Sequence, residues 1–237
     1  MSVIVVSGTG TEIGKTVVTA ALVALAGATG ARIAVLKPAQ TGVGPGEPGD
    51  LAEVARLGGE AHGVELVRFG EPLAPATAAR RAGAAGVRAE EVAETVEKLR
   101  TEYDLVLVEG AGGLLVRFHD GGDTLADAAR LLAAPVLVVT PAGLGTLNSV
   151  ALTGEALRAR GVEQLGVVVG SWPEVPDLAA RCNLVDLPEA AGAPLLGAVP
   201  EGAGRLAPAE FRAAAGGWLG PSLGGGWDAE AFTAAVG

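Results

Sequence analysis

The chain has 237 residues, and 49% of them are hydrophobic, which is enough to bury one substantial α/β core. Seventeen basic residues against 27 acidic ones give a net charge of -10, which disfavours nucleic acid and anionic membranes as partners. A single cysteine excludes an internal disulfide. Because the sequence has neither a secretory leader pattern nor an apolar run of about 18 residues, we expect a soluble, cytoplasmic protein.

Short β-branched runs alternate with longer helical patterns along the chain. Several runs are apolar without alternation, which is typical of strands buried on both faces of a parallel sheet. The predicted strands span residues 2–7, 32–37, 64–69, 104–108, 135–140, 165–169 and 194–199. The predicted helices span residues 16–29, 50–57, 89–101, 146–160 and 227–236. This order predicts one α/β domain over residues 1–237, a mainly parallel sheet of about seven strands between two helical layers, with the tail after Pro200 on the rim.

A glycine-rich loop joins the first predicted strand to the first predicted helix. It reads Gly-Thr-Gly-Thr-Glu-Ile-Gly-Lys-Thr from Gly8 to Thr16. In this setting backbone N–H groups and the positive helix end bind phosphate, a lysine reaches the terminal phosphates and a hydroxyl binds Mg²⁺. Lys15 and Thr16 occupy those two positions. The usual spelling has glycine where this chain has Thr9, yet the flanking strand and helix favour nucleotide binding over a plain glycine turn.

A lysine follows the phosphate loop at the next strand end. In an open parallel sheet, ligands bind beyond the carboxyl ends of the strands. Lys37 ends a predicted strand, and we expect the stretch from Pro38 to Gly42 to turn across that edge. A lysine there could balance negative charge that develops on a phosphoryl group or an acidic intermediate. The alternative is a solvated lysine at a strand end.

Two carboxylates are candidates for a metal site. Glu109 follows an apolar strand and precedes the stretch Gly110 to Gly113, the usual form of a second metal-site carboxylate in phosphate-loop enzymes. Asp50 starts a predicted helix, where it is either a metal ligand or simply an N-cap. Magnesium favours hard oxygen ligands and keeps several waters. Thr16, Asp50 and Glu109 would therefore be a sufficient share from the protein.

A further turn, Leu144 to Asn148, follows the strand predicted at 135–140 and opens a helix. Its free N–H groups could bind a carboxylate. A helix cap that binds no ligand explains this turn equally well.

Taken in series, these motifs resemble the dethiobiotin synthetase family. The resemblance extends from residue 1 to about residue 200 and includes the unusual spelling of the phosphate loop. It implies a phosphate-loop NTPase fold and an ATP-dependent cyclo-ligase of biotin synthesis. Such an enzyme joins CO₂ to 7,8-diaminononanoate and closes a ureido ring, releasing ADP and phosphate. The matching segments are Gly8–Thr16, Lys37-Pro38-Ala39-Gln40-Thr41-Gly42, Asp50-Leu51, Val108-Glu109-Gly110-Ala111-Gly112-Gly113 and Leu144-Gly145-Thr146-Leu147-Asn148.

The resemblance also implies a mechanism. One substrate amine captures CO₂ as a carbamate, and Lys37 and Lys15 would stabilise this anion and then the γ-phosphoryl group that it attacks. The second amine attacks the carbamic–phosphoric anhydride and expels phosphate, so no enzyme nucleophile is needed. Mg²⁺ would be held by Thr16, Asp50 and Glu109.

Further residues are implied as ligand contacts, and the working unit as a homodimer. In the family, the turn that corresponds to Leu144–Asn148 holds the substrate carboxylate at a dimer interface. The implied nucleotide contacts are Glu12, Ile13, Gly14, Lys15, Thr16, Val17, Asp50, Glu109, Gly110, Ala111, Gly112, Gly170, Ser171, Pro200, Glu201 and Gly202. The implied substrate contacts are Thr11, Thr41, Gly113, Leu144, Gly145 and Asn148.

One segment departs from the family. Members commonly have Asn-Asp after the sixth strand to read the adenine, whereas this chain has Gly170-Ser171-Trp172-Pro173. The amide that pairs with adenine is therefore missing. We expect weak discrimination between nucleoside triphosphates.

Other functions of the same fold are less well supported. Partition or placement ATPases, which act through partner binding, usually carry an extra lysine near the start of the phosphate loop, and this chain has none there. An amide-forming synthase of the cobyrinate type needs a glutamine-hydrolysing domain for which the chain has no room. A nucleotide-binding module without chemistry is the remaining alternative.

Overall fold

The computed structural model describes residues 3–236 and contains a seven-stranded sheet in the order β3-β2-β4-β1-β5-β6-β7. Every neighbouring pair of strands runs parallel, which confirms the predicted fold class. The first strand was predicted from Ser2, which lies outside the described residues. The strands are β1 (Val3–Gly8), β2 (Ile33–Thr41), β3 (His62–Phe69), β4 (Leu105–Glu109), β5 (Val136–Thr140), β6 (Gln164–Trp172) and β7 (Leu195–Pro200).

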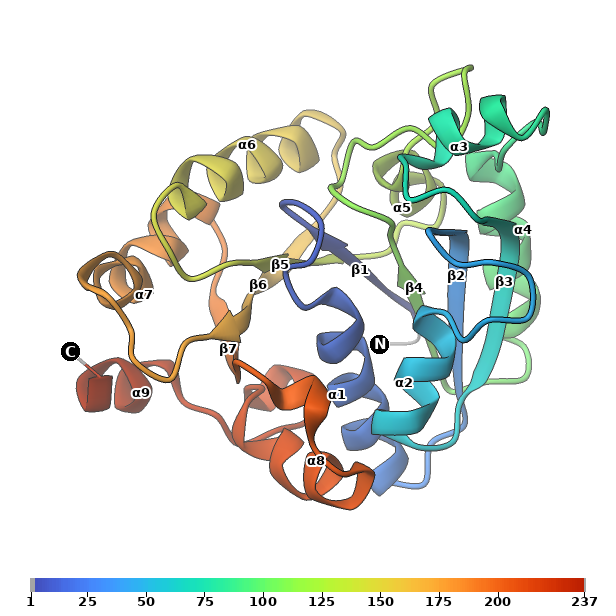
Figure 1. Cartoon of the computed structure of the whole chain (residues 1–237). Helices are drawn as coiled ribbons and strands as arrows, with labels where there is room; N and C mark the ends of the chain where they lie inside the picture. Colours follow the sequence, from blue (N-terminus) through green and yellow to red (C-terminus); the bar gives the residue numbers. More distant parts are fainter. Residues whose placement is uncertain (1–2, 237) are drawn as a thin grey trace.

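Helices cover both faces of this sheet (Figure 1). The sequence patterns predicted α1, α2, α4, α6 and α9. They missed α3, α5 and α8, which have seven residues each, and α7, whose pattern is interrupted by Pro188. The helices are α1 (Lys15–Ala28), α2 (Asp50–Gly58), α3 (Pro75–Arg81), α4 (Ala89–Leu99), α5 (Leu125–Leu131), α6 (Thr146–Ala159), α7 (Leu178–Ala191), α8 (Pro208–Ala214) and α9 (Ala229–Val236).

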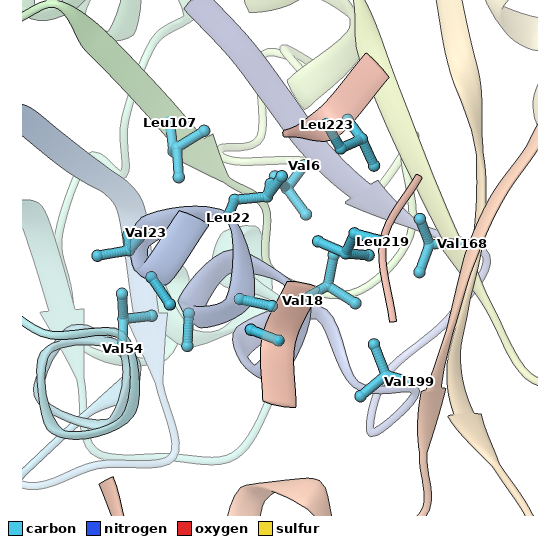
Figure 2. Packing of buried hydrophobic residues seen from close by; sticks show 14 of the residues in the cluster. Val6, Val18, Leu22, Val23, Val54, Leu107, Val168, Val199, Leu219 and Leu223 are labelled. Carbon is cyan, nitrogen blue, oxygen red and sulfur yellow. The ribbon is translucent and has the colours of Figure 1, made fainter. Parts of the chain in front are cut away.

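Strand β1 shows why helices pack on both faces of the sheet. Its side chains alternate between the two faces, because successive residues of a strand point in opposite directions. Ile4 and Val6 pack in the cluster that contains α1, whereas Val3 and Val5 pack in the cluster that contains α4 and α5. Figure 2 shows Val6 in the first cluster, beside Leu22 of α1. An unbroken apolar run is therefore what this central strand requires.

The segment after β7 belongs to the same core. Phe211 of α8 and Leu219 are fully buried, and they pack with Trp218 in the cluster around α1. The prediction that the tail packs on the rim is wrong for this segment. Its apolar residues are separated by glycines and follow no helical period. Hydrophobic periodicity therefore did not predict that they are buried.

Strand β2 continues beyond its predicted end. It runs through Pro38 to Thr41 and stays paired with β3, so the turn predicted after Lys37 is wrong. The ladder with β4 ends at Leu36, which leaves one edge of β2 without a partner strand beyond that residue. A proline is tolerated where a strand has only one paired edge, because a missing N–H then costs no ladder bond.

Strand β6 also runs further than predicted. It includes Gly170 and Ser171 and ends at Trp172, which pairs with Pro200 of β7. The segment 170–172 is therefore part of the sheet and not the loop that follows it. Within residues 3–236, no helix is long and apolar enough to cross a membrane.

The burial of the C-terminal segment generates a stability prediction. Phe211→Ala should lower the free energy of unfolding by about 3–5 kcal/mol, because it removes a fully buried ring and leaves a cavity. Denaturant unfolding measures the change. Leu178→Ala is the matched control, since that side chain is 69% exposed and its loss should change the free energy by no more than about 0.5 kcal/mol. A change below about 1 kcal/mol for Phe211→Ala would contradict its place in the core.

Candidate functional site

The carboxyl ends of β1, β2 and β4 open into one large cavity beside the phosphate loop, the phosphate cavity. Its volume is about 890 Å³, and it lies where the strand order places ligands in an open parallel sheet. Most of the predicted phosphate, metal and substrate residues line it. These residues are Thr11, Glu12, Ile13, Gly14, Lys15, Thr16, Val17, Lys37, Thr41, Asp50, Glu109, Gly110, Ala111, Gly112 and Gly113.

The phosphate loop reaches the start of α1 through left-handed backbone. Gly14 has φ 93° and directly precedes Lys15, the first residue of the helix, and Glu12 has φ 57°. A side chain on Gly14 would lie 2.2 Å from the carbonyl oxygen of Gly170, and one on Gly170 would lie 2.1 Å from the carbonyl oxygen of Ile13. Two facing glycines therefore let β6 approach the loop closely. This contact explains why glycine is needed at position 170.

Lys15 lies under the loop at the start of α1. It is 7% exposed, and its Nζ donates a hydrogen bond to the carbonyl oxygen of Gly10 at 2.7 Å. Burial, together with the nearby charge of Lys37, lowers the pKa of Lys15 from 10.5 to about 8. An anion in the cavity would favour the charged form of this lysine.

Lys37 is held between two carboxylates. Its Nζ lies 2.8 Å from Oε1 of Glu109 and 2.5 Å from Oδ2 of Asp50, and it also donates to the carbonyl oxygen of Gly110 at 3.1 Å. Lys37 is 2% exposed and Glu109 is 1% exposed. A solvated lysine at a strand end is therefore the wrong interpretation. Burial alone would lower the pKa of Lys37, but Glu109 and Asp50 outweigh burial and raise this pKa above its usual value.

Asp50 reaches Lys37 because its backbone is held in place. The first residue of α2 is Asp50 itself, and the preceding Gly49 occupies the N-cap position, so Asp50 is not an N-cap. The Asp50 N–H donates to Oε1 of Gln40 at 2.8 Å. Arg68 donates to the carbonyl oxygen of Glu47 at 2.6 Å and so anchors the preceding loop.

The residues predicted to hold magnesium fit a divalent cation. Thr16 donates through Oγ1 to Oε1 of Glu109 at 2.9 Å, and the Asp50 carboxylate contacts the same Lys37 ammonium as Glu109 does. Oε2 of Glu109 is buried and has no hydrogen-bond partner among residues 3–236. A buried carboxylate oxygen without a donor is a suitable cation ligand. In the described part of the chain no cluster of three His, Cys, Asp or Glu residues occurs, so a cation here would rely on this hydroxyl and on phosphate or water oxygens as well.

Several predicted contacts lie outside the large cavity. Glu201 follows β7, and its N–H donates to the carbonyl oxygen of Trp172 at 2.7 Å, which joins the ends of β6 and β7. Leu144 is 93% exposed at the start of α6. The structure therefore does not bring these segments into contact with the phosphate cavity. The predicted residues that do not line it are Leu144, Gly145, Asn148, Gly170, Ser171, Pro200, Glu201 and Gly202.

Sequence reasoning missed part of the cavity wall. The segment 72–75, which follows β3 and includes the first residue of α3, also lines the cavity. It follows a strand end at the same edge of the sheet, so the rule that identified Lys37 and Glu109 could also have identified it. Gln40 lies in the family-like segment Lys37 to Gly42, but the sequence pattern indicates no role for its side chain. Only the fold shows that its side chain fixes Asp50.

Comparison with protein families and solved structures gives consistent results. A family model described as "AAA domain" matches residues 2–205. Among solved structures, a ParA family ATPase from Chlorobium tepidum is 13% identical, with a TM-score of 0.57 and 89% of each chain covered. Chloroplast FtsY from Physcomitrella patens is 17% identical with a TM-score of 0.55, covering 99% of this chain and 65% of that one. At such low identity these structures share the fold alone.

Curated relatives are much more similar. ATP-dependent dethiobiotin synthetase BioD from Streptomyces coelicolor is 67% identical over 98% of each chain. The protein of the same name from Streptomyces avermitilis is 66% identical over 99% of each chain, and that from Saccharopolyspora erythraea is 67% identical over 96% of this chain and 99% of its own. Since such identity extends over nearly the full length of both chains, the chain belongs to the ATP-dependent dethiobiotin synthetase family.

Proposed function

We infer that the chain is an ATP-dependent cyclo-ligase that forms the ureido ring of dethiobiotin from 7,8-diaminononanoate and CO₂, releasing ADP and phosphate. Full-length relatives that carry the dethiobiotin synthetase name support this function. The structural observation behind it is the buried ammonium of Lys37 in the wall of the phosphate cavity. The partition-type ATPase is not favoured, because the ParA likeness extends to the fold alone.

The two lysines provide the positive charge that this chemistry needs. A carbamate formed on one substrate amine is an anion, and it attacks a γ-phosphoryl group that carries further negative charge. Lys37 and Lys15 both line the cavity in which these groups would meet. Charges fixed in place before the reaction stabilise a transition state without reorganisation, and positioning of the two reactants lowers the barrier further. The second substrate amine then displaces phosphate, so the enzyme needs no nucleophile of its own.

We propose that Thr16, Asp50 and Glu109 hold Mg²⁺ beside the nucleotide phosphates. The orphaned Oε2 of Glu109 supports this assignment. When bound, Mg²⁺ supplies charge neutralisation at the phosphate oxygens. Lys37 bridges the Asp50 and Glu109 carboxylates and so keeps both of them at this site.

Assembly and location are also proposals. We propose that residues 1–237 act as one domain in a cytoplasmic homodimer. The Leu144–Asn148 turn would hold the substrate carboxylate at the dimer interface. Leu144 is 93% exposed, so its apolar side chain is free to pack against a partner subunit at this turn. We further propose that Gly170, Ser171, Pro200, Glu201 and Gly202 face the base side of the nucleotide.

The deciding experiment is incubation of the enzyme with 7,8-diaminononanoate, bicarbonate, Mg²⁺ and ATP. Dethiobiotin, ADP and phosphate should form in equal amounts, and intact nucleotide binding without dethiobiotin would contradict the function.

Lys37→Ala should lower turnover by about 10²- to 10³-fold, with the nucleotide Kd changed by less than about threefold. Lys98→Ala, an exposed lysine of α4, is the matched control and should leave both values unchanged. Unchanged turnover in Lys37→Ala would remove the catalytic role of Lys37.

The nucleotide specificity should be broad. Position 170 is a glycine packed against the phosphate loop and Ser171 continues β6, so neither offers the amide that would pair with adenine. Specificity constants for ATP, CTP and GTP should therefore agree within about tenfold. Steady-state kinetics with each nucleotide tests this. A preference for ATP over CTP of about two orders of magnitude would contradict it.

A further inference from the structure

Three threonine hydroxyls form a chain across three separate segments. Thr9 lies at the start of the phosphate loop, Thr140 ends β5 and Thr146 begins α6. Oγ1 of Thr9 lies 3.1 Å from Oγ1 of Thr140, which in turn lies 2.5 Å from Oγ1 of Thr146. The Thr9 N–H also donates to the carbonyl oxygen of Val139 at 3.0 Å, which fixes Thr9 beside β5.

Burial sets the direction of the hydrogen bonds in this chain. Each hydroxyl carries one proton, so three protons are available for two hydrogen bonds. Thr140 is fully buried and Thr146 is 1% exposed. Among residues 3–236, neither of these two hydroxyls has a hydrogen-bond acceptor other than the neighbouring threonine hydroxyls. Thr146 must therefore donate to Thr140, and Thr140 must donate to Thr9. The opposite direction would leave a buried donor without a partner, which is costly.

The remaining proton belongs to Thr9. This residue is half-buried and lines two cavities, the phosphate cavity and a second one of about 300 Å³. The second cavity is lined mainly by apolar side chains between the 113–116 segment and α6, among them Leu114, Leu152 and Ala156. Thr9 therefore lies between the phosphate cavity, which contains charged side chains, and the more apolar second cavity.

We propose that Oγ1 of Thr9 donates a hydrogen bond to an oxygen of the substrate carbamate, and that Thr140 and Thr146 are positioning residues that orient this proton. The proposal deepens the proposed ligase function and rests on it. A donor with a preset direction suits an anionic acceptor. The apolar second cavity suits the carbon chain of the diamine better than it suits a phosphate, so the carbamate end would face Thr9.

The test compares valine and serine variants at Thr9 and Thr140, the two ends of the hydrogen bond between their hydroxyls. Thr9→Val should lower turnover by about 10- to 100-fold, while Thr9→Ser keeps the hydroxyl and should remain within about threefold of wild type. Thr140→Val should lower turnover by about three- to tenfold, and Thr140→Ser should restore it. The nucleotide Kd should change by less than about twofold in all four variants.

The double variant Thr9→Val/Thr140→Val separates positioning from general structural damage. If Thr140 acts through Thr9, the double variant should turn over no more slowly than Thr9→Val alone, because the hydroxyl that Thr140 orients is already absent. Multiplied effects would overturn the positioning role. If Thr140→Val fails to fold, the pair Thr9→Val and Thr9→Ser still tests the donor.

Two outcomes would overturn the role of Thr9. Full turnover in Thr9→Val would show that the hydroxyl does not touch the reacting group. An equal loss of nucleotide affinity in Thr9→Val would assign the donor to a phosphate instead of the carbamate. Failure of the ligase function is a separate result, because wild-type enzyme would then make no dethiobiotin before any variant is compared.

Discussion

The ion cluster of Lys37 with Glu109 and Asp50 is the interaction on which the site depends. A lysine that is 2% exposed can keep its charge only beside carboxylates, and here both lie within 2.8 Å of its Nζ. The need to pair this charge requires β2, β4 and the start of α2 to lie next to one another. Strand β2 supplies the lysine, its neighbour β4 ends on Glu109, and α2 begins at Asp50. The parallel order of the sheet thus places opposite charges at one edge.

The phosphate loop imposes a second constraint, which is steric. The loop lies so close to β6 that neither Gly14 nor Gly170 could carry a side chain without meeting backbone atoms. Strand β6 passes this contact and runs beyond its predicted end, because Trp172 still pairs with Pro200 of β7. The glycine that this packing requires at position 170 leaves no side chain there to contact a nucleotide base.

Local patterns predicted the fold class and most of the residues that line the large cavity, because apolar runs, glycine turns and strand-end charges are short-range signals. They failed where tertiary context decides. Pro38 was expected to end β2, yet the strand continues because only one of its edges is paired there. Phe211 is isolated between weakly patterned residues, and its burial depends on a cluster that contains residues of α1 and Trp218, all distant from its own helix or outside its pattern. The roles of Gln40 and Thr140 depend on partners 10 and 131 residues away in sequence, Asp50 and Thr9. No local pattern indicates such contacts.

Direct titration of the lysine side chains tests the central claim that Lys37 is a charge fixed by two carboxylates. The chain has only three lysines, Lys15, Lys37 and Lys98, so NMR of lysine labelled at Cε and Nζ gives three signals that single Lys→Arg variants can assign. Without nucleotide, Lys15 should lose its proton near pH 8, whereas Lys37 should stay protonated through pH 10.5, because its pKa is raised above that ordinary value. Deprotonation of Lys37 below about pH 9 would contradict the account.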